Sequence, residues 1–134
     1  MKMFGVFLLF VQILIFASGP ALAGGIEGRV QGYNCAAYGK GCATSATDPA
    51  AAAERVFVVR VKSGEFYFLT NVERSLLAGY LQRRVRVTGV VDAERNTVIA
   101  ESVAACNRGD WQVVWSAGLE EDWADKLGVA TIGM

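Results

Sequence analysis

The sequence predicts a mainly β domain in which five short strands close into a small barrel. Apolar and polar residues alternate along several short stretches, which is the period of a half-buried strand. Short turns that contain glycine or asparagine join these stretches in pairs. A single helical pattern follows the third stretch. The predicted order is therefore strand, long connection, two strands, helix, two strands, with an extension at the C-terminus.

Composition narrows the function classes. The chain has 134 residues, 53% of them hydrophobic, and it contains no histidine. Its length is typical of one domain, and its apolar fraction is too high for a disordered chain. The 13 basic and 13 acidic side chains balance, which is unlike a dedicated nucleic-acid-binding protein. Without histidine, the chain cannot form a histidine-dependent catalytic triad or an HExxH-type metal site.

The first 23 residues have the features of a cleavable signal peptide. Lys2 precedes an apolar run over residues 3–17, residues 18–20 (Ser-Gly-Pro) would end a helix, and residues 21–23 (Ala-Leu-Ala) match the A-x-A cleavage pattern. A retained anchor is the alternative, because the stretch approaches the roughly 20 residues that span a bilayer. The helix-breaking and small residues favour cleavage. We therefore expect a periplasmic or secreted protein with no stable membrane insertion.

Cleavage after residue 23 removes Lys2 and leaves a mature chain with a net charge of −1. We divide the mature chain into a barrel, residues 24–105, and a C-terminal extension, residues 106–134. An exported chain meets an oxidising environment, where cysteines form disulfides.

Two of the three cysteines are predicted to form a disulfide. Cys35 and Cys42 flank a glycine-rich segment that can bend freely, and their bridge would close a short loop. Cys106 is expected to stay unpaired, although pairing with another cysteine or with a second chain is the alternative. No metal site is expected, because the Cys-x6-Cys spacing is not a recognised zinc spacing. A redox site would need Cys-x-x-Cys, which is absent; Lys40 alone favours a thiolate only weakly.

The first part of the barrel consists of one strand and a long connection. Residues 26–32 alternate as a half-buried strand does, with Gly28 and Gly32 on the inward side, where a missing side chain permits a bulge. The connection runs from about residue 33 to residue 55. Within it, Asp48 before Pro49 is a strong helix start, and an alanine run follows. A helix of two turns or less is predicted there.

A hairpin and a helix follow. Residues 56–62 and 65–69 are two strand-forming runs separated by a Ser-Gly turn. Thr70 and Glu73 match a capping box, with Thr70 as the N-cap. The sequence therefore predicts a helix of roughly ten residues from this point. Its apolar face comprises Val72, Leu76, Leu77, Tyr80 and Leu81.

The last two barrel strands show the clearest alternation. Residues 84–92 place valines inward and Arg84, Arg86 and Thr88 outward. An Arg-Asn turn then leads to a final strand over residues 97–104. Five strands with a helix between the third and fourth are the order of an OB-fold, a Greek-key barrel.

The segment VRVTGVVDAERNTVIAESV, residues 85–103, resembles the fourth and fifth strands of exported bacterial OB-fold domains, of the oligonucleotide/oligosaccharide-binding-fold superfamily. The segment GEFYFLTN, residues 64–71, is similar to the third strand of these domains. The resemblance covers residues 26–104. The resemblance implies a barrel that binds a ligand, and it assigns no catalytic residue in this sequence.

The C-terminal extension holds every tryptophan of the chain: Trp111, Trp115 and Trp123. Residues 111–116 are predicted to form an edge strand or an extended arm, and residues 119–128 to form a short helix. Trp111 and Trp115 are expected to pack against the barrel. The alternative is a contact with a partner protein, because tryptophan is enriched at interface anchors.

We expect a non-catalytic binding protein with no cofactor. The expected ligand surface is the face of the second and third strands with the long first connection. Its candidate residues are Tyr67, Arg60, Lys62, Tyr38 and Lys40. The partner is an unidentified small ligand, or an envelope protein that the tryptophan-bearing tail docks on. Catalysis is not expected, because the chain lacks a base that would activate a serine or cysteine.

Single-stranded nucleic acid or oligosaccharide is a further alternative, because OB folds stack bases on aromatic residues in a positive groove. We do not expect nucleic acid, for three reasons. Alternation places Phe66 and Phe68 on one side, where they are predicted to fill the core. The arginines lie on the second and fourth strands, which are not neighbours in such a barrel. The mature net charge is −1.

Overall fold

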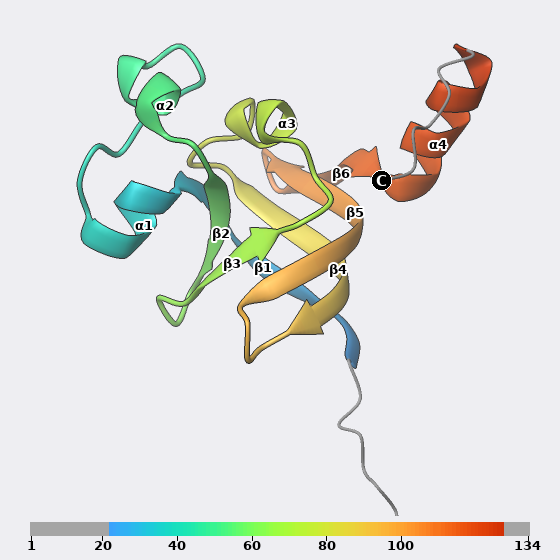
Figure 1. Ribbon diagram of the computed structural model, residues 1–134, viewed down its shortest axis with the longest axis horizontal. Coiled ribbons are helices and arrows are strands. Elements are labelled where there is room, and N and C mark those ends of the chain that lie inside the picture. The colour runs from blue at the N-terminus through green and yellow to red at the C-terminus, as the bar shows by residue number, and fades with distance from the viewer. Residues whose placement is uncertain (1–21, 128–134) are drawn as a thin grey trace, which may run out of the picture.

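A computed structural model describes residues 22–127, in ten elements (Figure 1). The predicted signal peptide lies outside the described residues except for residues 22 and 23, which begin the first strand. The strands are β1 (Leu22–Gly32), β2 (Phe57–Val61), β3 (Phe66–Leu69), β4 (Arg84–Asp92), β5 (Thr97–Asn107) and β6 (Asp110–Ser116). The helices are α1 (Tyr33–Tyr38), α2 (Pro49–Ala53), α3 (Arg74–Ala78) and α4 (Ala117–Lys126).

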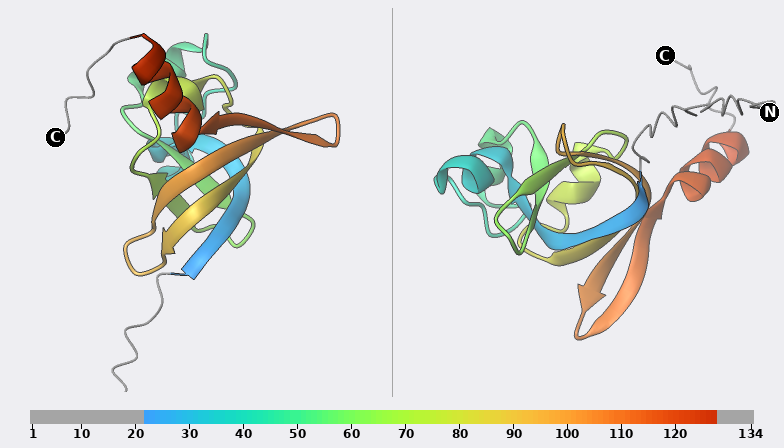
Figure 2. Two further views of the ribbon diagram at one scale, coloured as in Figure 1. Left: turned by 90° about the vertical axis from the view of Figure 1, so that its right-hand side faces the viewer. Right: turned by 90° about the horizontal axis from the view of Figure 1, so that it is seen from below.

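The strands form one six-stranded sheet in the order β3-β2-β1-β4-β5-β6, with antiparallel neighbours. A short parallel pairing between β3 and β5 closes the first five strands into a ring. β6 lies outside this ring. It pairs with the second half of β5, and the two strands project from the ring as a ribbon (Figure 2, right). The predicted mainly β architecture is confirmed at this level.

Inward-pointing valines form the centre of the core, as the alternating pattern predicts. Val85 and Val87 of β4 are buried, whereas Arg84, Arg86 and Thr88 between and beside them are exposed. The other strands of the ring contribute buried residues on the same inner side. These include Val30, Val59, Val98, Ala100, Val103 and Ala105. β1 and β2 approach closely at Gly28, where a Cβ atom would lie 2.2 Å from the carbonyl oxygen of Arg60.

The connection between β1 and β2 is ordered by local bonds. Asp48 caps α2, as predicted: its carboxylate accepts a hydrogen bond from the backbone N–H of Ala50 at 2.9 Å. This bond lowers the pKa of Asp48, with a second contribution from the backbone N–H of Thr44. The Cys35–Cys42 disulfide forms as predicted, and Cys106 is a free, half-buried thiol. The short helix α1 was not predicted.

The helix after β3 is shorter than predicted and begins later. Thr70 does not cap it, because its backbone N–H donates to the carbonyl of Val98 and so continues the pairing with β5. Asn71 then exchanges two side-chain hydrogen bonds with the backbone of Ala100. These bonds hold both residues against β5, so α3 starts at Arg74 with Glu73 as its N-cap. The predicted apolar face nevertheless reaches the core, where Val72, Leu77 and Leu81 are buried.

β3 has the opposite orientation to the predicted one. Tyr67 and Leu69 face the core, and Phe66 and Phe68 lie on the outer side. The register explains this, because Phe68 pairs with Val58 and Tyr67 pairs with Val59, which belongs to the core. Tyr67 fits the inner side because its hydroxyl reaches Glu65, to which it donates a hydrogen bond at 3.4 Å. Burial and the Glu65 charge raise the pKa of Tyr67.

The C-terminal extension forms both predicted elements. β6 is the edge strand, and α4 follows it directly, away from the ring (Figure 1). Trp115 and Val114 pack against the core, as expected for Trp115. None of the helices in the described part of the chain is long and apolar enough to cross a membrane.

Candidate functional site

Four aromatic side chains, two from α1 and two from β3, gather on the outer side of the sheet. Tyr33 is central: its ring centroid lies 5.7 Å from that of Phe66, 5.8 Å from that of Phe68 and 6.2 Å from that of Tyr38. Phe66 and Phe68 are 6.0 Å apart. These separations are typical of interacting rings. We call Tyr33, Tyr38, Phe66 and Phe68 the aromatic cluster.

The aromatic cluster is accessible although its rings are apolar. Tyr38 is 66% exposed, and the other three residues are half-buried. Val58 lies under the cluster on the outer side of β2 and is fully buried. The cluster therefore has an apolar floor and an open top. Three of the four ring contacts in the cluster are edge-to-face, at interplanar angles of 76° to 87°, and the fourth is tilted at 33°.

Helix α1 is held so that Tyr33 contacts Phe66 and Phe68 of β3. The backbone N–H of Tyr33 donates to the carbonyl of Val56 at 2.9 Å. Glu54 is almost completely buried, and its carboxylate accepts hydrogen bonds from the backbone N–H groups of Asn34 and Cys35 at the start of α1. Hydrogen bonding with the neighbouring Tyr38 raises the pKa of Tyr33.

A row of arginines begins beside the aromatic cluster and crosses three strands. Arg60 of β2 is paired with Phe66 of β3 on one side and with Arg29 of β1 on the other. Arg29 is in turn paired with Arg84 of β4. All three arginines are exposed on the outer face. We call Arg60, Arg29 and Arg84 the basic row.

The basic row lines an open cleft of about 510 Å³, together with Lys62, Gln31 and Glu27. Glu27 is the only carboxylate in this lining, and it forms ion pairs with Arg84 and with Arg86. Hydrogen bonds from these two guanidinium groups, that of Arg84 first, lower the pKa of Glu27. The cleft therefore keeps an excess of positive charge.

One uncharged side chain that lines the cleft, Gln31, has an atom without a hydrogen-bond partner among the described residues. The side-chain oxygen of Gln31 is buried and accepts no hydrogen bond from any described residue. The amide nitrogen of Gln31 donates to Gln82 at 3.4 Å. Gln31 is paired with Val58, so it lies between the basic row and the floor of the aromatic cluster.

Trp111 of β6 packs against two arginine side chains of β4 on the outer face. The guanidinium groups of Arg86 and Arg84 lie 4.1 Å and 5.7 Å from the centroid of the Trp111 ring, as in cation–π pairs. Trp111 is half-buried beneath them. The ring thus limits the conformations of both arginine side chains, which keeps their charged ends on the outer face.

Four of the five predicted ligand-binding residues line two different clefts. Arg60 and Lys62 line the basic cleft. Tyr38 and Lys40 line another cleft of about 490 Å³ at α1. Tyr67 is the exception, because it is 8% exposed and belongs to the core.

Sequence reasoning missed several residues of the face. Phe66 and Phe68 replace Tyr67 as the accessible rings of β3. Tyr33 and Arg29 were not singled out, although their neighbours were. The alternation of charged and apolar residues in β1 carried a signal for Arg29, since Glu27, Arg29 and Gln31 share one side of the strand. Arg84 was assigned correctly to an outer face but without its neighbours.

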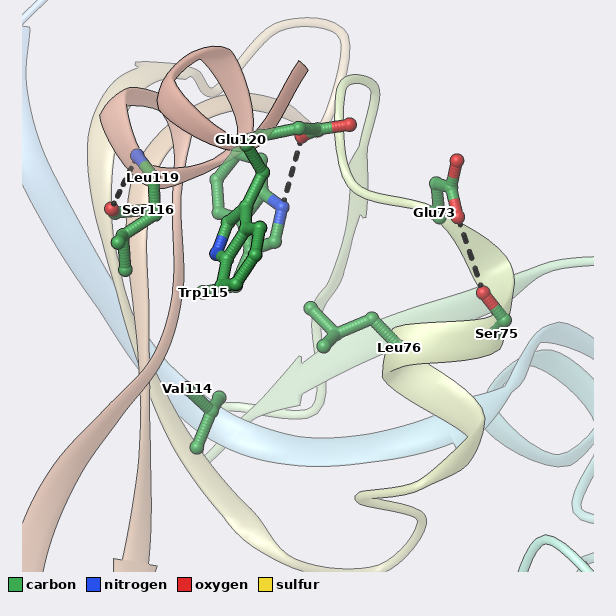
Figure 3. Close-up of a pocket in the computed structure, with 9 residues that line it drawn as sticks. Glu73, Ser75, Leu76, Val114, Trp115, Ser116, Leu119 and Glu120 are labelled. Carbon is green, nitrogen blue, oxygen red and sulfur yellow. Dashed lines mark hydrogen bonds between the residues drawn. The ribbon is translucent and has the colours of Figure 1, made fainter. Parts of the chain in front are cut away.

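A second, separate groove lies between α4, β6 and α3, with a volume of about 500 Å³ (Figure 3). Leu76, Val114 and Trp115 point toward one another across it, and the Trp115 indole N–H donates to Glu120 at 3.1 Å. Trp123 also lines the groove and is 60% exposed. The lining has an apolar centre and two carboxylates, Glu73 and Glu120.

The outer face combines accessible aromatic rings with exposed arginine side chains. No family model matches the chain, and no curated protein or solved structure is significantly similar to it.

Proposed function

We propose that this protein is a non-catalytic binding module with an OB fold. The order of pairing around the ring, β1-β2-β3-β5-β4, supports this assignment, as do the parallel β3–β5 contact and the helix between β3 and β4. These are the features of a five-stranded Greek-key barrel of this type. Strands β2 and β3 and the first connection then form the face on which such barrels bind ligands.

The observation that carries the proposal is the position of the aromatic cluster. Phe66 and Phe68 lie on the outer side of β3, and Tyr33 packs against both of them from α1. Half-exposed rings would be more stable in the core. A ligand with flat rings would cover them, and a stacking contact of this kind contributes about 1–3 kcal/mol per base in single-strand-binding proteins. The ligand is therefore a chain or molecule that carries rings.

We further propose that the protein acts outside the cytoplasm, in the periplasm or after secretion. The Cys35–Cys42 disulfide supports this location, because such bonds persist in oxidising compartments. The apolar N-terminal sequence with its A-x-A pattern supports it independently.

Two uncharged ring-bearing probes test the aromatic cluster. The ¹⁵N-labelled protein is titrated with chitohexaose and with a thymidine dodecamer that has a neutral methylphosphonate backbone. At least one probe is expected to shift the backbone amide signals of Tyr33, Phe66 and Phe68, with smaller effects elsewhere. Neutral probes isolate stacking, because they do not interact with the basic row as anions do.

Matched variants complete this test. Phe66→Leu with Phe68→Leu keeps an apolar cover over Val58 but removes both rings, and it is expected to abolish the shifts. Ile99→Ala, which truncates an exposed apolar side chain on β5, serves as the control. Binding that is unchanged in the double leucine variant, or no shift with either probe at millimolar concentration, would refute the proposed site.

Docking on an envelope protein through the C-terminal extension is the second candidate function. The exposure of Trp123 and Leu119 beside the apolar groove favours it, because buried tryptophans dominate many interfaces. Truncation after Ser116 removes α4 and leaves the ring intact. Loss of a co-purifying envelope protein, with retained thermal unfolding of the barrel, would support docking. Unfolding of the truncated chain would instead assign α4 to covering the core.

A further inference from the structure

The groove between α4, β6 and α3 differs from the outer face of the barrel in place and in charge. Its volume of about 500 Å³ lies within the range of cavities that hold small organic molecules. The described residues that line it belong to neither the aromatic cluster nor the basic row. We call it the α4 groove.

The apolar part of the α4 groove has a fixed side and an open side. Leu76 of α3 and Val114 of β6 point toward Trp115 across the groove, and Val114 and Trp115 also pack against the core (Figure 3). On the other side, Leu119 and Trp123 lie one turn apart on α4 and are 52% and 60% exposed. The α4 groove therefore offers one indole ring that the core holds in place and a second that is largely uncovered.

The charge of the α4 groove is negative. Of the described residues that line it, Glu73 and Glu120 are acidic and none is basic. Neither carboxylate forms an ion pair with a described residue. Glu120 accepts a hydrogen bond from the Trp115 indole N–H at 3.1 Å, and Glu73 accepts one from the Ser75 hydroxyl at 3.3 Å. Both donors are uncharged, so the two negative charges remain uncompensated.

The two basic residues closest to this lining have partners elsewhere. Arg74 follows Glu73 in the sequence, but its guanidinium donates to backbone carbonyls of the β1–β2 connection. Lys126 lies 5.9 Å from the Trp123 ring centroid, does not line the α4 groove and pairs with Asp122 at 2.7 Å. The negative charge of the groove is thus not cancelled by either residue.

We propose that the α4 groove binds an organic ammonium ion that carries an apolar group. The face of an indole ring attracts a cation more strongly than any other aromatic side chain does, and aromatic sites recognise quaternary ammonium groups in this way. The uncompensated carboxylates complement the positive charge. The apolar side chains accept the rest of the ligand. This inference goes beyond the proposed function and does not rest on it.

The arrangement also orients the ligand. The Glu120 carboxylate is held next to the Trp115 ring by their hydrogen bond, so negative charge and an aromatic face meet on the α4 side. The ammonium group would lie there. The apolar group would extend toward Leu76 and Val114, between α4 and α3 (Figure 3).

The tryptophan side chains provide a residue-specific test. The ¹⁵N-labelled full protein is titrated with benzyl(hydroxyethyl)dimethylammonium, and the indole N–H signals are followed by NMR. The signals of Trp115 and Trp123 are expected to shift with one dissociation constant. The signal of Trp111 is the internal control and should not move, because Trp111 packs against Arg84 and Arg86 on the outer face.

An uncharged analogue isolates the role of the positive charge. In this analogue a carbon atom replaces the nitrogen, so its size and apolar groups are unchanged. It is expected to bind about 2- to 30-fold more weakly, which is the fold-change that corresponds to the usual strength of a cation–π contact.

Matched variants assign the effect to the α4 groove. Trp123→Leu keeps an apolar side chain and is expected to lose most of the preference for the cation over its uncharged analogue. Glu73→Gln with Glu120→Gln should weaken cation binding about 2- to 20-fold, the range for two exposed charge contacts. Glu65→Gln with Glu94→Gln removes the same charge outside the groove and should bind like the parent protein. Thermal unfolding of each variant confirms that it is folded.

Several results would overturn the proposal. They are equal binding of the uncharged analogue, an equal shift of the Trp111 signal, unchanged binding by Trp123→Leu, and no shift at millimolar concentration. A basic amphipathic peptide of leucine and lysine is titrated in parallel. If it shifts Trp115 and Trp123 while the small cation does not, the α4 groove is a docking surface for a protein and the proposal fails. The neutral probes of the aromatic cluster report on other residues, so either site can fail without the other.

Discussion

Arg29 of β1 lies directly opposite Arg60 of β2 on the outer face of the barrel. The two residues are paired by register and not by a local turn, since they lie on strands joined by the long connection that holds α1 and α2. Their placement concentrates charge beside the aromatic cluster. The same placement is expected to lower the unfolding free energy of the protein while it favours anion binding, and both quantities can be measured.

Arg60→Glu is expected to stabilise the fold while it weakens binding. The new carboxylate would face Arg29, which replaces a repulsive cross-strand pair by an attractive one worth about 0.2–1 kcal/mol. Urea unfolding should show this increase. Affinity for polyphosphate should fall at least tenfold, because one arginine is lost from the cleft and a negative charge is added. The same change at Arg108, at the tip of the β5–β6 ribbon, should alter neither quantity appreciably. A parallel loss of stability and binding would contradict this interpretation.

Glu27→Gln is expected to strengthen anion binding. Glu27 holds Arg84 and Arg86 through ion pairs, so its neutral replacement releases both guanidinium groups and adds one positive charge to the net charge of the cleft. A several-fold rise in affinity for polyphosphate should be seen at low salt and should diminish as salt increases. Glu65→Gln, which removes a carboxylate from the β2–β3 turn region, is the comparison variant. Weaker binding by Glu27→Gln would show that Glu27 positions the arginines rather than competing with the ligand.

Lowering the pH should have the same effect on anion binding as the substitution Glu27→Gln. The ion pairs lower the pKa of Glu27 in the folded state below its ordinary value of 4.5. Their contribution to stability is therefore present above pH 4.5 and is lost as the pH falls through the lowered pKa. In the same range, protonation frees Arg84 and Arg86. Polyphosphate affinity should rise in the parent protein as the pH falls below 4.5, and this rise should be absent in Glu27→Gln.

The sequence predicted the strands of the barrel better than it predicted which residues lie on the outer face of β2 and β3. In β4, valines alternate with arginines and threonine, so the inward side follows from polarity alone. In β3, residues 66–69 are all apolar or aromatic, and nothing local decides whether Phe68 or Leu69 points inward. The β2–β3 register decides it, together with the hydroxyl of Tyr67, which reaches Glu65 at the rim.

The basic row depends on contacts that are remote in sequence. Arg29 meets Arg84 only because β1 pairs with β4, and it meets Arg60 only because β1 pairs with β2. Local alternation predicts that each arginine is exposed, but not that the three are adjacent. The cap on α1 has the same origin, since Glu54 reaches Cys35 from the far end of the connection.

The disulfide and the buried Glu54 carboxylate are expected to stabilise α1 by separate means. Replacing both Cys35 and Cys42 by serine removes a cross-link over an eight-residue loop, which should cost about 2.5 kcal/mol of unfolding free energy. Gly32→Ala should also destabilise the protein, by about 1–3 kcal/mol, because its Cβ atom would lie 2.4 Å from the side chain of Glu54. Both variants displace the helix that carries Tyr33, so both should weaken the response to neutral ring-bearing probes. They should leave polyphosphate binding nearly unchanged, because Arg60 and Arg84 lie on β2 and β4. Urea unfolding and the two probe titrations measure these effects together. An equal loss of polyphosphate binding would show that the row and the cluster do not act as separable parts of the face.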